Sequence, residues 1–161
     1  MLVHGAAGGV GSFAVELARW KGAHVIGTSS ANNLEFVRSL GAESAIDYNA
    51  TPFEKVVNGM DVVIDTVGGD FPKRSYKVLR PNGIFVTVAT QLPEDAGKAE
   101  GIKAMAGRRA PIELLREISE LLESKKINPE VGRIFPLIDG RKAQELSETG
   151  HGRGRIVLQI R

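Results

Sequence analysis

A turn of small residues between a strand and a helix constrains the fold of this chain more than any other feature. Residues 2–4 (LVH) are typical of a buried strand, and a helical pattern runs from Val10 to Lys21. Between them the sequence is Gly5-Ala6-Ala7-Gly8-Gly9. This order of elements predicts the strand–turn–helix unit that binds the pyrophosphate of a dinucleotide. The start of the helix offers free N–H groups and the positive end of the helix dipole to such an anion.

The spacing in the turn departs from G-x-G-x-x-G, because Ala6 stands at the first glycine position before Gly8 and Gly11. Gly8 lets the backbone approach a phosphate, and Gly11 lets the helix pack closely on the strand. The alternative is a purely structural turn of small residues. A second strand expected over His24–Thr28 lies where a dinucleotide unit requires it and favours binding. The candidate pyrophosphate contacts are Ala6, Ala7, Gly8, Gly9, Val10 and Gly11.

Composition indicates one soluble globular chain with a core of its own. The 161 residues are 42% hydrophobic and 25% charged, which is ordinary for such proteins. A net charge of +2 is too small an excess to favour nucleic acid or a membrane surface as a partner. No signal-peptide pattern is visible, and the apolar runs are short for a spanning helix. The absence of cysteine excludes disulfides and thiolate zinc ligands within these residues, and we expect a cytoplasmic protein.

Strand and helix patterns alternate and predict an α/β Rossmann fold, a doubly wound parallel sheet in three αβα layers. Further strands are expected over residues 44–48, 61–65, 84–89 and 102–106, the last one poor in β-formers. A helix capped by Asn32 or Asn33 is expected to run through Leu40, and further helices are expected over 52–57, 71–79 and 111–124, with a turn at 81–83. After residue 127 the pattern becomes strand (131–137), helix (140–147) and strand (155–160). We therefore divide the chain into an NAD(P)-binding domain, residues 1–127, and a C-terminal segment, residues 128–161.

Several motifs, in order, resemble the medium-chain dehydrogenase/reductase superfamily, and specifically its zinc-independent quinone oxidoreductase and enoyl reductase branch. After the glycine turn they are LGA (40–42) with IDY (46–48), DTVGG (65–69), LRPNG (79–83) and GRIVL (154–158). The resemblance implies hydride transfer from a nicotinamide cofactor to a quinone or an activated double bond. It also implies a GroES-like catalytic domain upstream, which residues 128–161 would complete. Because the chain starts almost inside its first strand, we expect it to lack that domain, to be incomplete as an enzyme and to hold no catalytic residue.

The segment after the second strand predicts NADP(H) in preference to NAD(H). NAD sites place an acid there for the ribose 2′-hydroxyl, but residues 28–33 contain none. Hydroxyl and amide groups can donate to a 2′-phosphate, which makes Thr28, Ser29, Ser30 and Asn33 the candidates. By the resemblance, Tyr48 assists, and a lysine is common where Asn33 stands. Arg38 or Arg153 could supply the missing charge, with a solvated surface position as the alternative for each.

The ends of the fourth and fifth strands supply the remaining candidates. Thr66, Val67 and Gly68 are candidates after the fourth strand, where Gly68 and Gly69 would allow close backbone approach to the cofactor ribose, with a plain turn as the alternative. By the resemblance, Val88, Ala89 and Thr90 lie near the nicotinamide. We expect Asp47 and Asp65 to cap turns at strand ends and not to form an acid–base pair. The histidines, at positions 4, 24 and 151, do not have metal-ligand spacing, and we expect no zinc.

Two other functions stay open at this point: a non-catalytic dinucleotide-binding module or truncated gene product, and a fragment of a zinc-dependent alcohol dehydrogenase. The AAGGVG turn disfavours the second. We also expect a homodimer. An unpaired edge strand near residues 102–106 is open to pairing, and the apolar residues of 131–137 and 155–160 would otherwise be exposed.

Overall fold

A six-stranded parallel sheet forms the body of the protein. The computed structural model describes residues 1–150 and 152–161, and the sheet has the strand order β3-β2-β1-β4-β5-β6. The strands are β1 (Leu2–His4), β2 (Ile26–Ser29), β3 (Ser44–Asp47), β4 (Met60–Asp65), β5 (Leu79–Thr87) and β6 (Lys103–Ala106). All neighbouring strands pair in parallel. The order reverses beside β1, as in a Rossmann fold, so the predicted fold class is confirmed.

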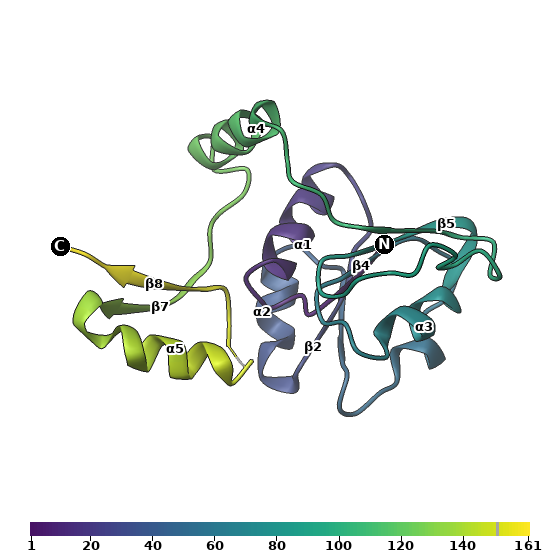
Figure 1. Cartoon of the computed structure of the whole chain (residues 1–161), viewed down its shortest axis with the longest axis horizontal. Helices are drawn as coiled ribbons and strands as arrows, with labels where there is room; N and C mark the ends of the chain where they lie inside the picture. Colours follow the sequence, from purple (N-terminus) through teal and green to yellow (C-terminus); the bar gives the residue numbers. More distant parts are fainter. Residues whose placement is uncertain (151) are drawn as a thin grey trace.

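Helices cover both faces of this sheet (Figure 1). One face carries α1 (Gly11–Trp20) and α2 (Leu34–Ser39), which the short η1 (Ala31–Asn33) precedes; the other carries η2 (Phe53–Lys55) and α3 (Phe71–Tyr76). Successive strand residues point to opposite faces. Val3 accordingly packs in a cluster with Val15 of α1, and Leu2 packs in a second cluster with Phe53. The adjacent residues Leu2 and Val3, both fully buried, thus anchor the two halves of the core.

The C-terminal part of the chain leaves this sheet. It comprises α4 (Ile112–Glu123), β7 (Val131–Pro136), η3 (Leu137–Asp139), α5 (Gly140–Glu148) and β8 (Arg155–Gln159). Strands β7 and β8 pair in parallel in a separate sheet, and Figure 1 shows them with α5 to one side of the main body. We call α5, β7 and β8 the C-terminal unit. A backbone bridge joins it to the glycine turn, where Gly154 N donates to Ala7 O at 3.0 Å.

Several element boundaries differ from the expectation. The helix expected to run to Leu79 ends at Tyr76, because Leu79 already pairs with Met60 in the sheet. The turn expected at residues 81–83 lies within β5, whose pairing with β4 resumes at Ile84, so the intervening residues loop out. The helix expected over 52–57 is a single 3₁₀ turn. Asn33 precedes α2 but makes no side-chain capping bond, and its Oδ1, the atom that would cap, accepts a hydrogen bond from Arg153 instead.

The sixth strand forms despite its few β-formers, since all four of its residues pair with β5. Residues 111–124 hold the expected helix, with Pro111 before its first turn. Among the described residues, no helix is both long and apolar enough to cross a membrane.

Candidate functional site

The glycine turn is shaped by close approaches of backbone to backbone. Gly5 has a φ of +65°, and a Cβ there would lie 2.5 Å from Thr66 Oγ1. A Cβ on Gly11 would lie 2.8 Å from Ala6 Cα and closer still to the carbonyl oxygen of Gly5, so α1 packs directly on the turn. Gly8 N donates to Gly5 O at 2.9 Å and closes the turn. Gly5 was not among the predicted residues, although its place directly after a strand is a signal for a glycine-only conformation.

A groove of about 340 Å³ runs along the turn at the carboxyl ends of the strands. It brings together predicted residues from the turn, from the end of β2 and from the ends of β3 and β4. This follows from the topology, because parallel strands end at one edge of the sheet, where ligands of such folds bind. The residues that line the groove are Gly5, Ala7, Gly8, Ser29, Ser30, Asn33, Tyr48, Thr66, Val67, Gly150 and Gly152.

Other predicted residues lie around or beneath this groove. Ala6, Gly11 and Thr28 are buried, Val10 is exposed at the start of α1, and Gly9 lines a neighbouring hollow. Gly68 lies against the end of β5, since a Cβ there would be 3.3 Å from Ala89 Cβ. Val88 and Thr90 are exposed beside Ala89. The structure thus separates a set of groove-lining candidates from a set that supports or flanks them.

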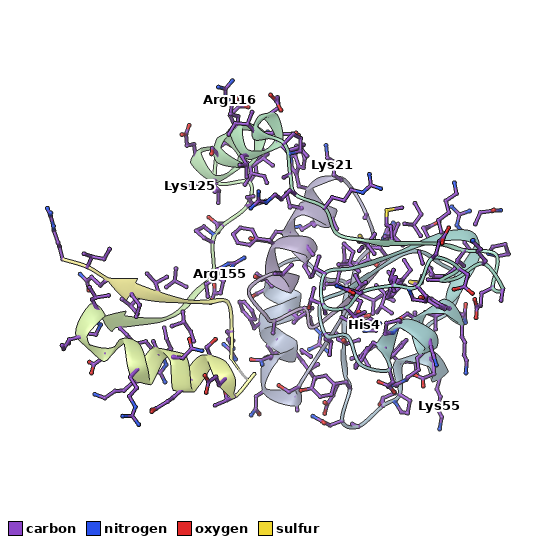
Figure 2. All side chains as sticks on the ribbon, in the orientation of Figure 1. His4, Lys21, Lys55, Arg116, Lys125 and Arg155 are labelled. Atoms are coloured by element: carbon purple, nitrogen blue, oxygen red, sulfur yellow. The ribbon has the colours of Figure 1, made fainter. Side chains whose placement is uncertain are left out.

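Thr28 and His4 support the turn from below. The hydroxyl of Thr28 lies 3.1 Å from His4 Nδ1 and 3.4 Å from Gly5 N. His4 Nε2 lies 3.0 Å from the hydroxyl of Ser75, and the ring packs edge-on against Phe53 and Phe71. Figure 2 shows His4 inside the main body. Burial lowers the pKa of His4 to about 4, so the ring is neutral at pH 7 and ties β1 to β2 and α3.

Asp65 organises the loop between β4 and α3. Its fully buried carboxylate accepts hydrogen bonds from the backbone N–H groups of Val67 and Gly68, both at 2.9 Å. The other carboxylate oxygen accepts a bond from the Thr87 hydroxyl at 2.9 Å. Asp47 likewise accepts a bond from the backbone N–H of Asn49. Both aspartates cap turns at strand ends, as expected.

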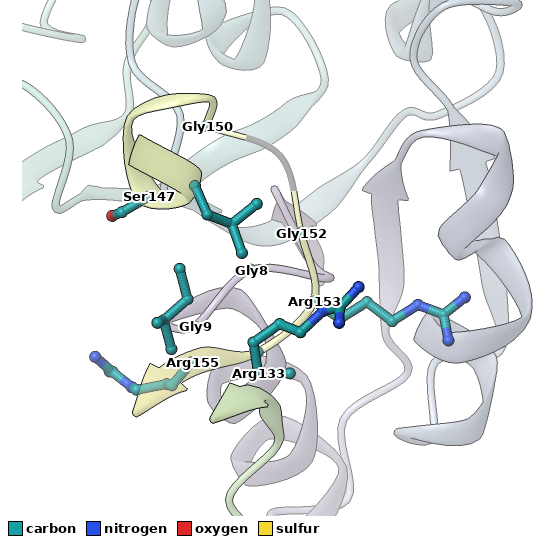
Figure 3. A pocket seen from close by; sticks show the side chains of 12 residues that line it. Gly8, Gly9, Arg133, Ser147, Gly150, Gly152, Arg153 and Arg155 are labelled. Atoms are coloured by element: carbon teal, nitrogen blue, oxygen red, sulfur yellow. The ribbon is translucent and has the colours of Figure 1, made fainter. Parts of the chain in front are cut away.

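Arginines from the C-terminal unit stand beside the glycine turn. A second hollow, of about 670 Å³, lies next to Gly8 and Gly9, and Arg133, Arg153 and Arg155 line it (Figure 3). A Cβ on Gly9 would lie 3.3 Å from Arg155 Cγ. Arg133 and Arg155 were not predicted as site residues, because no local pattern relates the end of the chain to its first turn.

The two arginines considered for a phosphate differ in position. Arg153 donates from Nε to Asn33 Oδ1 and from Nη2 to the Asn32 carbonyl, both at 2.8 Å. Arg38 instead pairs with Glu35 one turn away on α2. Neither arginine lines the groove itself, but Arg153 lines the adjoining hollow and bonds Asn33, which is a groove residue.

Metal binding has no support in the described part of the chain, where no three His, Cys, Asp or Glu side chains are grouped to hold an ion. His24 pairs with Glu43 at the surface, His4 is buried, and His151 lies outside the described residues. The described residues therefore do not bring together the set of ligands that a zinc ion needs.

Comparison with known proteins identifies the family. Residues 40–158 match a family model described as zinc-binding dehydrogenase. The mitochondrial NAD(P)H oxidoreductase RTN4IP1 of Danio rerio is 32% identical over 99% of this chain and 49% of its own length. The 2-methylene-furan-3-one reductase of Solanum lycopersicum is 33% identical over 98% of this chain and 39% of its own. The quinone oxidoreductase structure from Coxiella burnetii has a TM-score of 0.93 at 38% identity, over 99% of this chain and 52% of that one.

The chain thus spans about half the length of the relatives it matches, or less. These relatives match 98–99% of this chain, which includes the glycine turn, the Rossmann sheet and the C-terminal unit. The chain belongs to the zinc-binding dehydrogenase family, within the medium-chain dehydrogenase/reductase superfamily.

Proposed function

We propose that this chain is the NADP(H)-binding part of an oxidoreductase that reduces a quinone or an activated carbon–carbon double bond. The observation that carries the proposal is the groove in which the glycine turn meets the polar end of β2. The names of the relatives support the general class of reaction, since they describe an NAD(P)H oxidoreductase, a reductase and a quinone oxidoreductase.

The groove and the hollow beside it suit the parts of a dinucleotide. The backbone of residues 6–11 would hold the pyrophosphate, with the charges of Arg133 and Arg155 beside it. Thr66, Val67 and Gly68 would face a ribose, and Val88, Ala89 and Thr90 the nicotinamide side. The cofactor supplies the hydride, while these residues bind it, orient it and cover one side of it.

The preference for the phosphorylated cofactor rests on the lining near β2. Ser29, Ser30, Asn33 and Tyr48 line this part of the groove, and all four are uncharged. The nearby acid, Asp47, pairs in register with Ser29 but is not part of the lining, and its carboxylate caps the turn at Asn49. A 2′-phosphate would thus meet donors without a facing carboxylate.

The C-terminal unit has a separate role in this proposal. Ile134, Ile138 and Ile160 are 61%, 92% and 77% exposed, an apolar surface that favours packing against another domain. We infer that residues 128–161 complete a catalytic domain of the kind that the resemblance implies. A cytoplasmic location is part of the proposal, although the Danio rerio relative is named as mitochondrial.

Calorimetric titration with NADPH and NADH tests the cofactor assignment. We expect NADPH to bind at least about tenfold more tightly, since one hydrogen bond to a charged group contributes about 1.5–3 kcal/mol. Equal or tighter binding of NADH would contradict the preference, and binding of neither would contradict the function. Oxidation of NADPH by a simple quinone, with this chain alone or with an added catalytic domain, separates an enzyme part from a non-catalytic dinucleotide-binding module.

A further inference from the structure

Arg153 crosses from the C-terminal unit to the polar end of β2. It lies two residues before β8 and reaches η1, where its guanidinium donates to Asn33 Oδ1 and to the Asn32 carbonyl. The guanidinium carbon also lies 5.3 Å from the ring centroid of Phe36 on α2. Three contacts, with residues 117 to 121 positions earlier in the sequence, hold this side chain at one place on the nucleotide-binding body.

The partners of Arg153 are all neutral. In the described part of the chain, no carboxylate lies within ion-pair distance of it. A guanidinium has five N–H donors, and the two printed bonds occupy one on Nε and one on Nη2. Both N–H groups of Nη1 have no protein acceptor among the described residues. The full charge and a fork of donors are therefore available to an anion.

The position of this charge points to the groove. Asn33, which accepts the bond from Arg153, also donates from Nδ2 to the hydroxyl of Ser30 at 3.2 Å. Ser30, Asn33 and Gly152, the residue before Arg153, all line the groove. An anion at Ser30 and Asn33 would lie beside the guanidinium that bonds Asn33, and a phosphate is a stronger acceptor for arginine than an amide oxygen.

We propose that Arg153 is the residue that selects the 2′-phosphate of NADP(H), and that this contact clasps the C-terminal unit to the nucleotide-binding sheet. The inference rests on the proposed function and extends it. It gives the C-terminal unit a part in cofactor choice, because the charge missing near β2 comes from beyond α5. NADP(H) would hold the two parts together, whereas NAD(H), which lacks the phosphate, would not.

Matched variants test the selection. In Arg153→Ala we expect NADPH affinity to fall about 10- to 100-fold, with NADH affinity changed less than about twofold. Arg153→Lys keeps the charge but loses the planar fork, so part of the NADPH affinity should return. Arg141→Ala removes the same charge from α5, where Arg141 pairs with Glu145, and both affinities should stay as in the wild type. The fragments 2′,5′-ADP and 5′-ADP, titrated in the same way, isolate the phosphate from the nicotinamide half.

Hydrogen exchange tests the clasp. NADPH, and not NADH, should slow backbone exchange in residues 152–155 and 32–36 of the wild type, and Arg153→Ala should abolish this difference. If Arg153→Ala lowers the affinities for NADPH and NADH equally, or lowers neither, the inference is wrong. In that case a wild-type preference for NADPH still supports the proposed function. If the wild type itself binds NADH as tightly as NADPH, the cofactor assignment fails, and the inference fails with it.

Discussion

Replacing Gly8 with valine separates phosphate binding from folding. A Cβ at this position would meet the carbonyl oxygen of Gly5 at 3.3 Å, which the turn can accommodate by a shift of a few tenths of an ångström. Gly8 is also outside the left-handed φ region that the structure records for other glycines. The expected loss of stability is therefore small, about 1 kcal/mol, as for an ordinary substitution near the surface.

The effect on binding should be far larger. Gly8 lines both the groove and the adjoining hollow, so the branched side chain would occupy the space through which a phosphate reaches the backbone. Hydrogen bonds to a charged group contribute about 1.5–3 kcal/mol each. The loss of two of them weakens NADPH binding by about 3 kcal/mol or more, which is over roughly 100-fold.

Gly11→Ala is the matched control within the same turn. Its Cβ would press on Ala6 Cα and on the carbonyl of Gly5, so α1 must move away from β1. Overpacking of this kind costs about 1–3 kcal/mol, and each kcal/mol lowers Tm by about 2–4 °C in a protein of this size. Thermal denaturation followed by circular dichroism, together with calorimetric titration, measures both effects. Gly8→Val binding NADPH like the wild type, or Gly11→Ala keeping the wild-type Tm, would refute this reasoning.

Three further predictions follow from the support of the site and from its surroundings. Burial lowers the pKa of folded His4 from 6.5 to about 4, so the unfolded chain binds more protons in that range; stability should drop by up to about 3 kcal/mol as the pH falls through it. In His4→Gln, the free energy of unfolding measured by urea denaturation should depend less on pH between pH 4 and 6.5 than in the wild type. An unchanged pH dependence would contradict this prediction. Asp65→Ala removes the acceptor of three hydrogen bonds and should cost about 3 kcal/mol or more; a shift in Tm below about 2 °C would disprove this. Sedimentation at micromolar concentration should show a homodimer, because β6 is an edge strand open to pairing, and a monomer would contradict that expectation.

The sequence by itself determined the sheet and the turn. Apolar strands, amphipathic helices and glycine stops are local patterns, and a right-handed crossover between parallel strands leaves few topologies to choose from. The turn at residues 5–11 could be recognised because its need for small residues is local. A Cβ on Gly11 would meet only backbone atoms of Gly5 and Ala6, which belong to the same turn. The turn-capping role of Asp65 was predictable for the same reason, since it depends on the next three residues.

Only the tertiary structure decided which polar residues face the groove. Thr28 and Ser29 both carry a hydroxyl group, so the sequence alone does not distinguish them as ligands. The alternation of side chains along β2 turns the Thr28 hydroxyl toward His4 and leaves Ser29 in the groove lining. The burial that keeps the His4 ring uncharged depends on Phe53 and Phe71, which are distant in sequence. The placing of Arg153 on Asn33 depends on the bridge between Gly8 and Gly154. Contacts across more than a hundred residues leave no periodicity in the sequence, because they arise only when distant segments pack together in the folded chain.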